Sequence, residues 1–204
     1  MKMENQEKVW NAIASDWHKL KTIPSKTVTE FLNKSRGKIL DFGSGSGRDL
    51  LWLKPKKDRE LYLVDFSGNM LKLAKQRAKT LGIKIKTEKS NIVKTDFKDS
   101  FFDGAVFDSV LHCIPEEEKR KETVRELFRI LKSKAEAVIL VWNKKAERFK
   151  NSPKEKFVAW KDKGKRYYYL YDEKEIYDLF EKCGFKIIIK NPDKDSIIFV
   201  VQKP

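Results

Sequence analysis

Cysteine is nearly absent from this 204-residue chain, which contains only Cys113 and Cys183. Two cysteines so far apart build neither a disulfide framework nor a metal site, so we expect a reducing, cytoplasmic location and no bound metal. Long apolar runs are absent too. No stretch approaches the length that spans a bilayer, and the first eight residues hold no hydrophobic signal segment, so we expect no membrane association.

Acidic residues are also in short supply, with 30 Asp and Glu against 45 Lys and Arg and a formal net charge of +15. This balance favours a polyanionic partner, RNA or DNA ahead of an acidic membrane surface, although a generally lysine-rich proteome explains the same composition. The chain is long enough for one full core, and 40% hydrophobic residues indicate a folded globule. We therefore expect a single domain over residues 1–204.

Glycine is scarce as well, with nine residues, yet three of them stand at alternate positions after a short apolar run. The run predicts a buried strand that ends in Asp41, and Gly43, Gly45 and Gly47 follow it. The dinucleotide pattern G-x-G-x-x-G places its third glycine one residue later. The spacing D-x-G-x-G-x-G instead resembles the S-adenosylmethionine site of Rossmann-like methyltransferases. That resemblance implies that Asp41 helps to hold the ammonium group of the cofactor, and that the loop, with Ser44, passes beneath its amino-acid part and ribose.

Later strand ends supply the other expected cofactor contacts. The second strand is expected to end at Asp65, where an acid accepts hydrogen bonds from both ribose hydroxyls, with Phe66 beside it. The methyltransferase resemblance implies adenine contacts from Asn91 and Ile92, which follow the expected third strand. Leu111 stands at the end of the fourth strand, which we expect to open onto the reacting methyl group, because ligands of doubly wound sheets bind outside the carboxyl ends of the strands.

The order of the expected elements predicts an α/β fold of the Rossmann-like type. As in the methyltransferases it resembles, the sheet should have seven strands, mostly parallel with the last strand antiparallel, and helices on both faces. Residues 1–35 are expected to form a helical lid over the cofactor cleft. A short helix is expected at 49–53, and the last three strands at 135–142, 185–190 and 196–202.

Residues 144–166 break the apolar pattern and contain ten basic residues against three acids. Phe149, Phe157 and Trp160 are interleaved with them. Lysines pair with phosphates while exposed rings stack on splayed bases, so this basic aromatic insertion favours RNA binding. The alternative is a solvated loop whose aromatic residues anchor it to the core.

A narrower resemblance runs in order along nearly the whole chain. It is carried by Val9–Ala14, Lys21, Pro24, Thr29–Leu32, Val110–His112, Val141–Trp142, Phe157–Trp160 and Arg166–Tyr171. These stretches resemble the tRNA wobble-uridine methyltransferases, which convert 5-carboxymethyluridine to its methyl ester. The family resemblance implies S-adenosylmethionine as cofactor, tRNA as substrate and a small zinc-ribbon activator as a partner.

Methylation of a carboxylate needs placement more than proton transfer, because a carboxyl with an ordinary pKa near 4 is already ionised at neutral pH. A cation must hold the acceptor, and we expect Lys21 first and Arg166 next in this role. His112 is expected to orient the uridine or the carboxylate, or else to be a structural hydrogen-bonding residue at a strand end. The aromatic residues expected to stack on or hydrogen-bond to the substrate are Trp160, Tyr167 and Tyr169.

Two other functions fit the same sequence. The chain departs from the wobble-uridine family at several places, with Lys21 where the family has arginine and Tyr169 where it has histidine. A methyltransferase for a small metabolite is therefore one alternative. A catalytically silent RNA-binding module is the other, although the complete set of cofactor residues argues against it.

Overall fold

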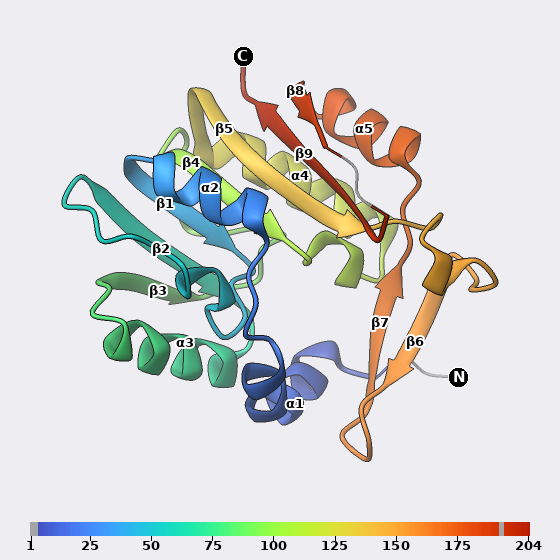
Figure 1. The fold of residues 1–204 in the computed structure, drawn as a ribbon. Coiled ribbons are helices and arrows are strands. Elements are labelled where there is room, and N and C mark those ends of the chain that lie inside the picture. The colour runs from blue at the N-terminus through green and yellow to red at the C-terminus, as the bar shows by residue number, and fades with distance from the viewer. Residues whose placement is uncertain (1–3, 192–193) are drawn as a thin grey trace.

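A single seven-stranded sheet organises the molecule (Figure 1). The computed structural model describes residues 4–191 and 194–204. In spatial order the strands are β3 (Ile85–Lys89), β2 (Arg59–Asp65), β1 (Gly37–Phe42), β4 (Phe102–Asp108), β5 (Leu131–Trp142), β9 (Ser196–Gln202) and β8 (Lys186–Lys190). Strands β1 to β5 run parallel, and β9 pairs antiparallel with both β5 and β8. The predicted Rossmann-like fold is confirmed.

Helices cover both faces of the sheet. They are α1 (Gln6–Leu20), α2 (Lys26–Lys34), α3 (Gly68–Thr80), α4 (Glu117–Ile130) and α5 (Glu173–Lys182). One apolar layer unites side chains of α2 and α3 with the sheet, and a second layer unites α4 and α5 with its opposite face. Both faces of the central strands are therefore buried, which explains why these strands are almost uniformly apolar.

The helix expected at 49–53 is wrong in type and length. The structure has one 3-10 turn there, η1 (Arg48–Leu50), and the chain then returns to the sheet at β2. Pro55 lacks a backbone N–H and disfavours the α conformation for the residue before it, so a longer helix has no room to form. Leu50 still packs into the layer formed by α2 and α3.

The 144–166 segment is folded against the body. It contains the 3-10 turn η3 (Glu147–Phe149) and the strand β6 (Glu155–Ala159), which forms an antiparallel hairpin with β7 (Lys165–Tyr169). Phe149 is buried and Trp160 packs on Trp17 of α1, with ring centroids 5.7 Å apart. Phe157 is 43% exposed, so of the three aromatic residues only this one presents a large accessible surface. Phe149 and Trp160 thus match the alternative in which aromatic residues anchor this segment to the core.

Helix α1 lies beyond the ends of the parallel strands, next to the β6–β7 hairpin (Figure 1). Its side chains contact both α3 and β7. Asn5 caps the N-terminus of α1, because its Oδ1 accepts a hydrogen bond from the backbone N–H of Lys8. No helix in the described ranges, 4–191 and 194–204, has the length and apolar character of a membrane span.

Candidate active site

A cavity of about 510 Å³ opens where β1, β2 and β4 end, with α1 as one wall. Seven of the predicted cofactor residues line it: Gly43, Ser44, Gly45, Asp65, Phe66, Asn91 and Ile92. Asp41 and Gly47 lie just behind the lining. The fold therefore brings together residues from three strand ends, as expected for ligands of a doubly wound sheet.

The three glycines of the loop have different physical roles. All three have positive φ, which favours glycine. A Cβ on Gly43 would lie 2.5 Å from Val110, and one on Gly47 would lie 3.1 Å from Leu50, so these two permit close packing within the protein. A Cβ on Gly45 would meet nothing within 4 Å, and Gly45 lines the cavity. Gly45 is therefore the position at which the loop leaves room for a ligand.

Asp65 ties the loop to the next helix. Its Oδ2 accepts from the backbone N–H of Gly45 and its Oδ1 from that of Ser67, both at 2.8 Å. Each carboxylate oxygen can accept a second hydrogen bond. Asp65 can therefore hold the loop in place and still accept from two vicinal hydroxyls.

The Asn91 side chain makes one hydrogen bond within the turn that follows β3. Its Oδ1 accepts from the backbone N–H of Val93 at 3.1 Å. The oxygen keeps one acceptor site, and the amide nitrogen makes no hydrogen bond among the described residues. An adenine ring can thus receive or donate a hydrogen bond here, beside the side chain of Ile92.

Sequence reasoning missed a buried ionic network beside the loop. Arg48 bridges two carboxylates: its Nε donates to Asp49 at 3.2 Å and its Nη2 donates to Asp108. The hydroxyl of Ser109 also donates to Asp108, at 2.7 Å. All four residues line the cavity. The available signal was Asp108 itself, because it ends β4 just as Asp65 ends β2.

The arrangement fits S-adenosylmethionine. Asp41, Asp49 and Asp108 are buried close to the guanidinium group of Arg48, and Asp65 is buried at the end of β2, so the cavity suits a ligand with cationic ammonium and sulfonium groups. Within the described part of the chain, the buried hydroxyls of Ser44 and Ser46 have no hydrogen-bond partner, so both are available to a ligand. When bound, the cofactor supplies an electrophilic methyl group on a sulfonium sulfur.

The buried carboxyls make both stability and cofactor binding depend on pH. Burial raises the pKa of Asp65 to about 6, and burial together with the charge of Asp108 raises the pKa of Asp49 to about 7. Between about pH 4 and these values the folded protein therefore binds more protons than the unfolded chain, so these groups make the protein less stable as the pH rises. Cofactor affinity should change in the opposite direction, because the acceptor role of Asp65 requires the ionised form.

We expect the affinity for S-adenosylmethionine to be about tenfold lower at pH 5 than at pH 7.5, since pH 5 lies one unit below the pKa of Asp65. Titration calorimetry across this range measures the affinity, and thermal melts without cofactor measure the stability. The Asp65→Asn variant is the control and should lose most of the dependence. An affinity that stays constant from pH 5 to 7.5 in the unmodified protein would contradict this assignment.

The predicted acceptor cation, Lys21, lies at the end of α1. Its Nζ is 5.0 Å from the ring centroid of Trp17, which lines the cavity. Burial and the nearby charges of Arg48, Arg148 and Arg166 lower the pKa of Lys21, while Asp108 acts in the opposite direction. Of these four cations, Arg48 lines the cavity, and Lys21 lies against the aromatic face of Trp17. Trp10 and Trp17 were not assigned to the site from the sequence, but both line the cavity.

Arg166 and Trp160 lie behind that aromatic face and do not line the cavity. Arg166 is only 5% exposed, its Cζ lies 4.8–5.2 Å from the ring centroids of Trp160, Trp17 and Tyr168, and its Nη1 donates to the Tyr168 hydroxyl at 2.6 Å. Trp160 donates from Nε1 to Asp16 at 3.1 Å. Both residues therefore support the Trp17 side of the cavity. The Nε atom of Arg166 is buried and has no hydrogen-bond partner among the residues that the structure describes.

The expectation that Leu111 and His112 open onto the methyl group needs correction. Both are buried in the 3-10 turn η2 (Leu111–Cys113), and neighbouring Val110 lines the cavity instead. The His112 ring is 1% exposed, stacks on Trp142 and accepts from the Trp142 backbone N–H through Nδ1 at 3.2 Å. Burial lowers the pKa of His112 to about 3, so the imidazole is neutral at physiological pH. The alternative of a structural hydrogen-bonding histidine matches this geometry.

Tyr167 and Tyr169 lie on the opposite face of β7 from Arg166 and Tyr168, toward α4 and α5. The Arg120 Nη1 lies 3.5 Å from the Tyr167 hydroxyl, and the Tyr169 hydroxyl donates to Glu175. Neither residue lines the cofactor cavity. The alternation of an extended strand separates them from it, because neighbouring side chains point to opposite faces.

The comparisons with known proteins concern the type of domain. A family model described as a methyltransferase domain matches residues 39–134, which include most of β1, the glycine loop and β4. Residues 39–134 thus match a methyltransferase domain over slightly less than half of the chain, and the fold of the chain is that of S-adenosylmethionine-dependent methyltransferases. Within the described residues, no group of three or more His, Cys, Asp and Glu side chains is arranged to hold a metal ion.

Among curated proteins, the chain is 26% identical over 76% of its length to a tRNA (carboxymethyluridine(34)-5-O)-methyltransferase of Xenopus tropicalis, covering 23% of that protein. It is 24% identical over 87% of its length to phosphoethanolamine N-methyltransferase 1 of Triticum aestivum, covering 35% of that protein. The chain spans between 23% and 59% of the length of the first curated relatives it matches.

Solved structures share the fold at low identity. A S-adenosylmethionine-dependent methyltransferase of Methanosarcina mazei has a TM-score of 0.74 at 21% identity, with 89% of this chain and 98% of that chain covered. A chain from the complex between the Haloferax volcanii Trm112 methyltransferase activator and a methyltransferase has a TM-score of 0.72 at 16% identity, with both chains fully covered. These similarities concern the fold alone.

Proposed function

We propose that this protein methylates the carboxymethyl group of uridine 34 in tRNA, with S-adenosylmethionine as methyl donor. The observation that carries the proposal is Lys21 beside Trp17, with Nζ 5.0 Å from the ring centroid and with Arg48 and Arg148 close enough for their charges to act on it. A carboxylate on a planar base matches both parts of this surface, the cations and the aromatic face. The tRNA methyltransferase relative and the formal net charge of +15 support the same acceptor.

The same cations favour an anionic acceptor group over a cationic one. A protonated amine beside these cations would be repelled, while a carboxylate would be attracted. The substrate named for the phosphoethanolamine N-methyltransferase relative carries a phosphate as well as an amine, and the same cations would attract its phosphate, so the methyl-transfer assay and not this electrostatic preference distinguishes the two acceptors.

The proposed reaction requires no proton transfer. The acceptor carboxylate is ionised at neutral pH, and one of its oxygens forms the bond to the methyl carbon as the carbon–sulfur bond breaks. The acceptor becomes a neutral ester, so it loses its attraction to Lys21 after transfer. Lys21 thus holds the acceptor in line before the reaction and releases it afterwards.

Replacing Lys21 with alanine should lower kcat/KM for tRNA about 100-fold, because a charge-assisted contact to the acceptor is lost. The dissociation constant for S-adenosylmethionine should change less than about twofold, since Lys21 does not line the cofactor cavity. Lys19→Ala is the matched control, because Lys19 is exposed on the same helix and should have no effect. Lys21→Arg should retain most of the activity.

The assay measures methyl transfer to bulk tRNA that lacks the wobble methyl ester, followed by nucleoside mass spectrometry. Activity on RNA should fall steeply as the salt concentration rises, whereas activity on a small metabolite should not. Tight cofactor binding without formation of the methyl ester would reject the proposed acceptor. The proposed setting is the cytoplasm, where tRNA is available.

We also propose that an activator subunit of the zinc-ribbon type associates with the enzyme. The fold similarity to a chain crystallised with the Trm112 activator supports this association. Adding such an activator to the tRNA assay should raise the rate. Full activity of a monodisperse isolated chain would contradict it.

A further inference from the structure

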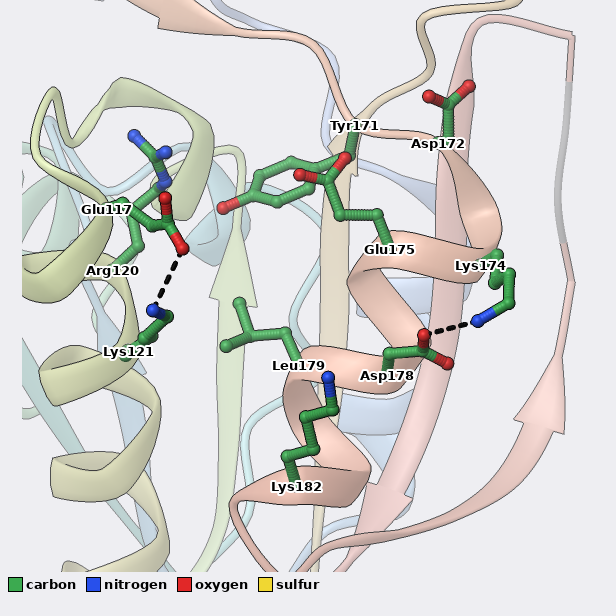
Figure 2. A pocket seen from close by; sticks show the side chains of 10 residues that line it. All are labelled: Glu117, Arg120, Lys121, Tyr171, Asp172, Lys174, Glu175, Asp178, Leu179 and Lys182. Atoms are coloured by element: carbon green, nitrogen blue, oxygen red, sulfur yellow. Dashed lines mark hydrogen bonds and ion pairs between the residues drawn. The ribbon is translucent and has the colours of Figure 1, made fainter.

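A second cavity, of about 540 Å³, lies between α4 and α5, outside the cofactor site (Figure 2). Its walls come from the first turns of α4, the length of α5 and the segment that joins β7 to α5. The cavity shares no lining residue with the cofactor cavity. None of the residues assigned to cofactor or acceptor binding above lines it.

The carboxylates of this second cavity already have cationic partners. Glu117 pairs with Lys121 at 2.8 Å, and Asp178 pairs with Lys174 at 2.5 Å, as the dashed lines in Figure 2 show. Glu175 pairs with Lys154 at 2.7 Å and accepts from Tyr169. Asp172 also lies 3.8 Å from Lys154. The acceptor groups in the lining are thus engaged within the protein.

Three side chains in the lining keep donor groups that are not used within the described residues. The hydroxyl of Tyr171 is buried without a hydrogen-bond partner, on a side chain only 2% exposed, and Figure 2 shows it directed toward Arg120 and Glu117. Within the described ranges, Lys182 forms no ion pair, and Arg120 uses only Nη1 for hydrogen bonds. Unused donors of this kind favour an anionic ligand with several acceptor oxygens.

Arg120 also connects this cavity to the cofactor site. Its Nη1 donates to the carbonyl oxygens of Ile114 and Pro115, both at 2.9 Å, and these two residues line the cofactor cavity. The guanidinium group also stacks on Tyr169, with Cζ 4.0 Å from the ring centroid. A ligand that binds the remaining N–H groups of Arg120 would fix the loop that forms one wall of the cofactor site.

We propose that the cavity between α4 and α5 is an effector site for a small ligand that carries a phosphate or carboxylate group. The anion accepts from the Tyr171 hydroxyl and the free N–H groups of Arg120, with Lys182 adding positive charge. Through Arg120 it holds the Ile114–Pro115 loop and tightens the binding of S-adenosylmethionine.

The test titrates the full chain with inorganic phosphate and, separately, with succinate, at constant ionic strength adjusted with sodium chloride. Calorimetry gives the affinity, and the two arms show which anionic group is preferred. Tyr171→Phe should weaken binding of the preferred anion at least tenfold, since it removes one hydrogen bond to a charged group. Lys182→Gln should also weaken it. Tyr177→Phe is the matched control, because its hydroxyl is likewise buried without a partner but does not line the cavity.

Thermal melts separate a ligand site from a purely structural residue. Both Tyr→Phe variants should melt about 2–6 °C higher than the unmodified protein without anion, because each loses an unpaired buried hydroxyl. Only Tyr171→Phe should lose the further increase caused by the anion. Equal anion binding by Tyr171→Phe and the unmodified protein would indicate ions on surface lysines and overturn the site. Binding that leaves S-adenosylmethionine affinity unchanged would overturn the effector role.

Discussion

Asp65→Asn should weaken S-adenosylmethionine binding about 100-fold, the loss expected when one or two hydrogen bonds to a charged group disappear. The carboxylate accepts from Gly45 and Ser67 through different oxygens. An amide in its place presents an N–H group to one of these backbone donors, so one buried N–H loses its acceptor. The same change removes the negative charge that receives the ribose hydroxyls.

Titration calorimetry at pH 7.5 gives the affinity of the variant, and circular dichroism shows whether it is folded. Asp58→Asn is a suitable control. Asp58 directly precedes β2, the strand that ends at Asp65, and the side chain of Asp58 is 47% exposed. The control should bind the cofactor like the unmodified protein. Unchanged affinity in a folded Asp65→Asn variant would exclude Asp65 as a cofactor ligand.

Arg48→Met should have the largest effect on stability, lowering the free energy of unfolding by about 3 kcal/mol at pH 8.5. The guanidinium group bridges Asp49 and Asp108, and its removal leaves buried carboxylates without a counter-ion. The loss should be smaller at pH 6, because Asp49 has a pKa of about 7 and is largely protonated there. Urea unfolding at the two pH values measures both quantities.

A double-mutant cycle identifies the source of that loss. Asp108→Asn removes one of the two carboxylates that Arg48→Met leaves without a counter-ion. The double variant Arg48→Met/Asp108→Asn should therefore be more stable than Arg48→Met alone. Equal losses at both pH values, or strictly additive effects of the two substitutions, would show that Arg48 stabilises the fold by packing of its aliphatic stem instead.

The strand ends and the loop between β1 and β2 were predictable from local sequence. Asp41 and Asp65 each follow an apolar run, and three closely spaced glycines need no partner elsewhere in the chain to be recognised. The carboxyl ends of parallel strands meet at one edge of a sheet, so the sequence predicted that the cofactor residues of β1 and β2 lie together. The role of each glycine was not predictable, because it depends on Val110 and Leu50, which pack against Gly43 and Gly47.

The acceptor side depended on contacts between distant segments. Trp17 of α1 meets Trp160 and Arg166 of the β6–β7 hairpin, and no periodicity within either segment predicts that pairing. Likewise, the 3-10 turn η2 turns His112 inward against Trp142, while its place in the sequence pointed to the open end of β4.

The sequence by itself thus determined the fold class and most of the cofactor site, because short apolar runs, turn glycines and terminal acids are local signals. Only the tertiary structure decided which basic and aromatic side chains face the cavity and which are buried behind it. Arg48, Lys21 and Arg166 have the same charge, and the sequence pointed to Lys21 and Arg166 but not to Arg48. Their different roles follow from burial and from the partners that long-range packing supplies.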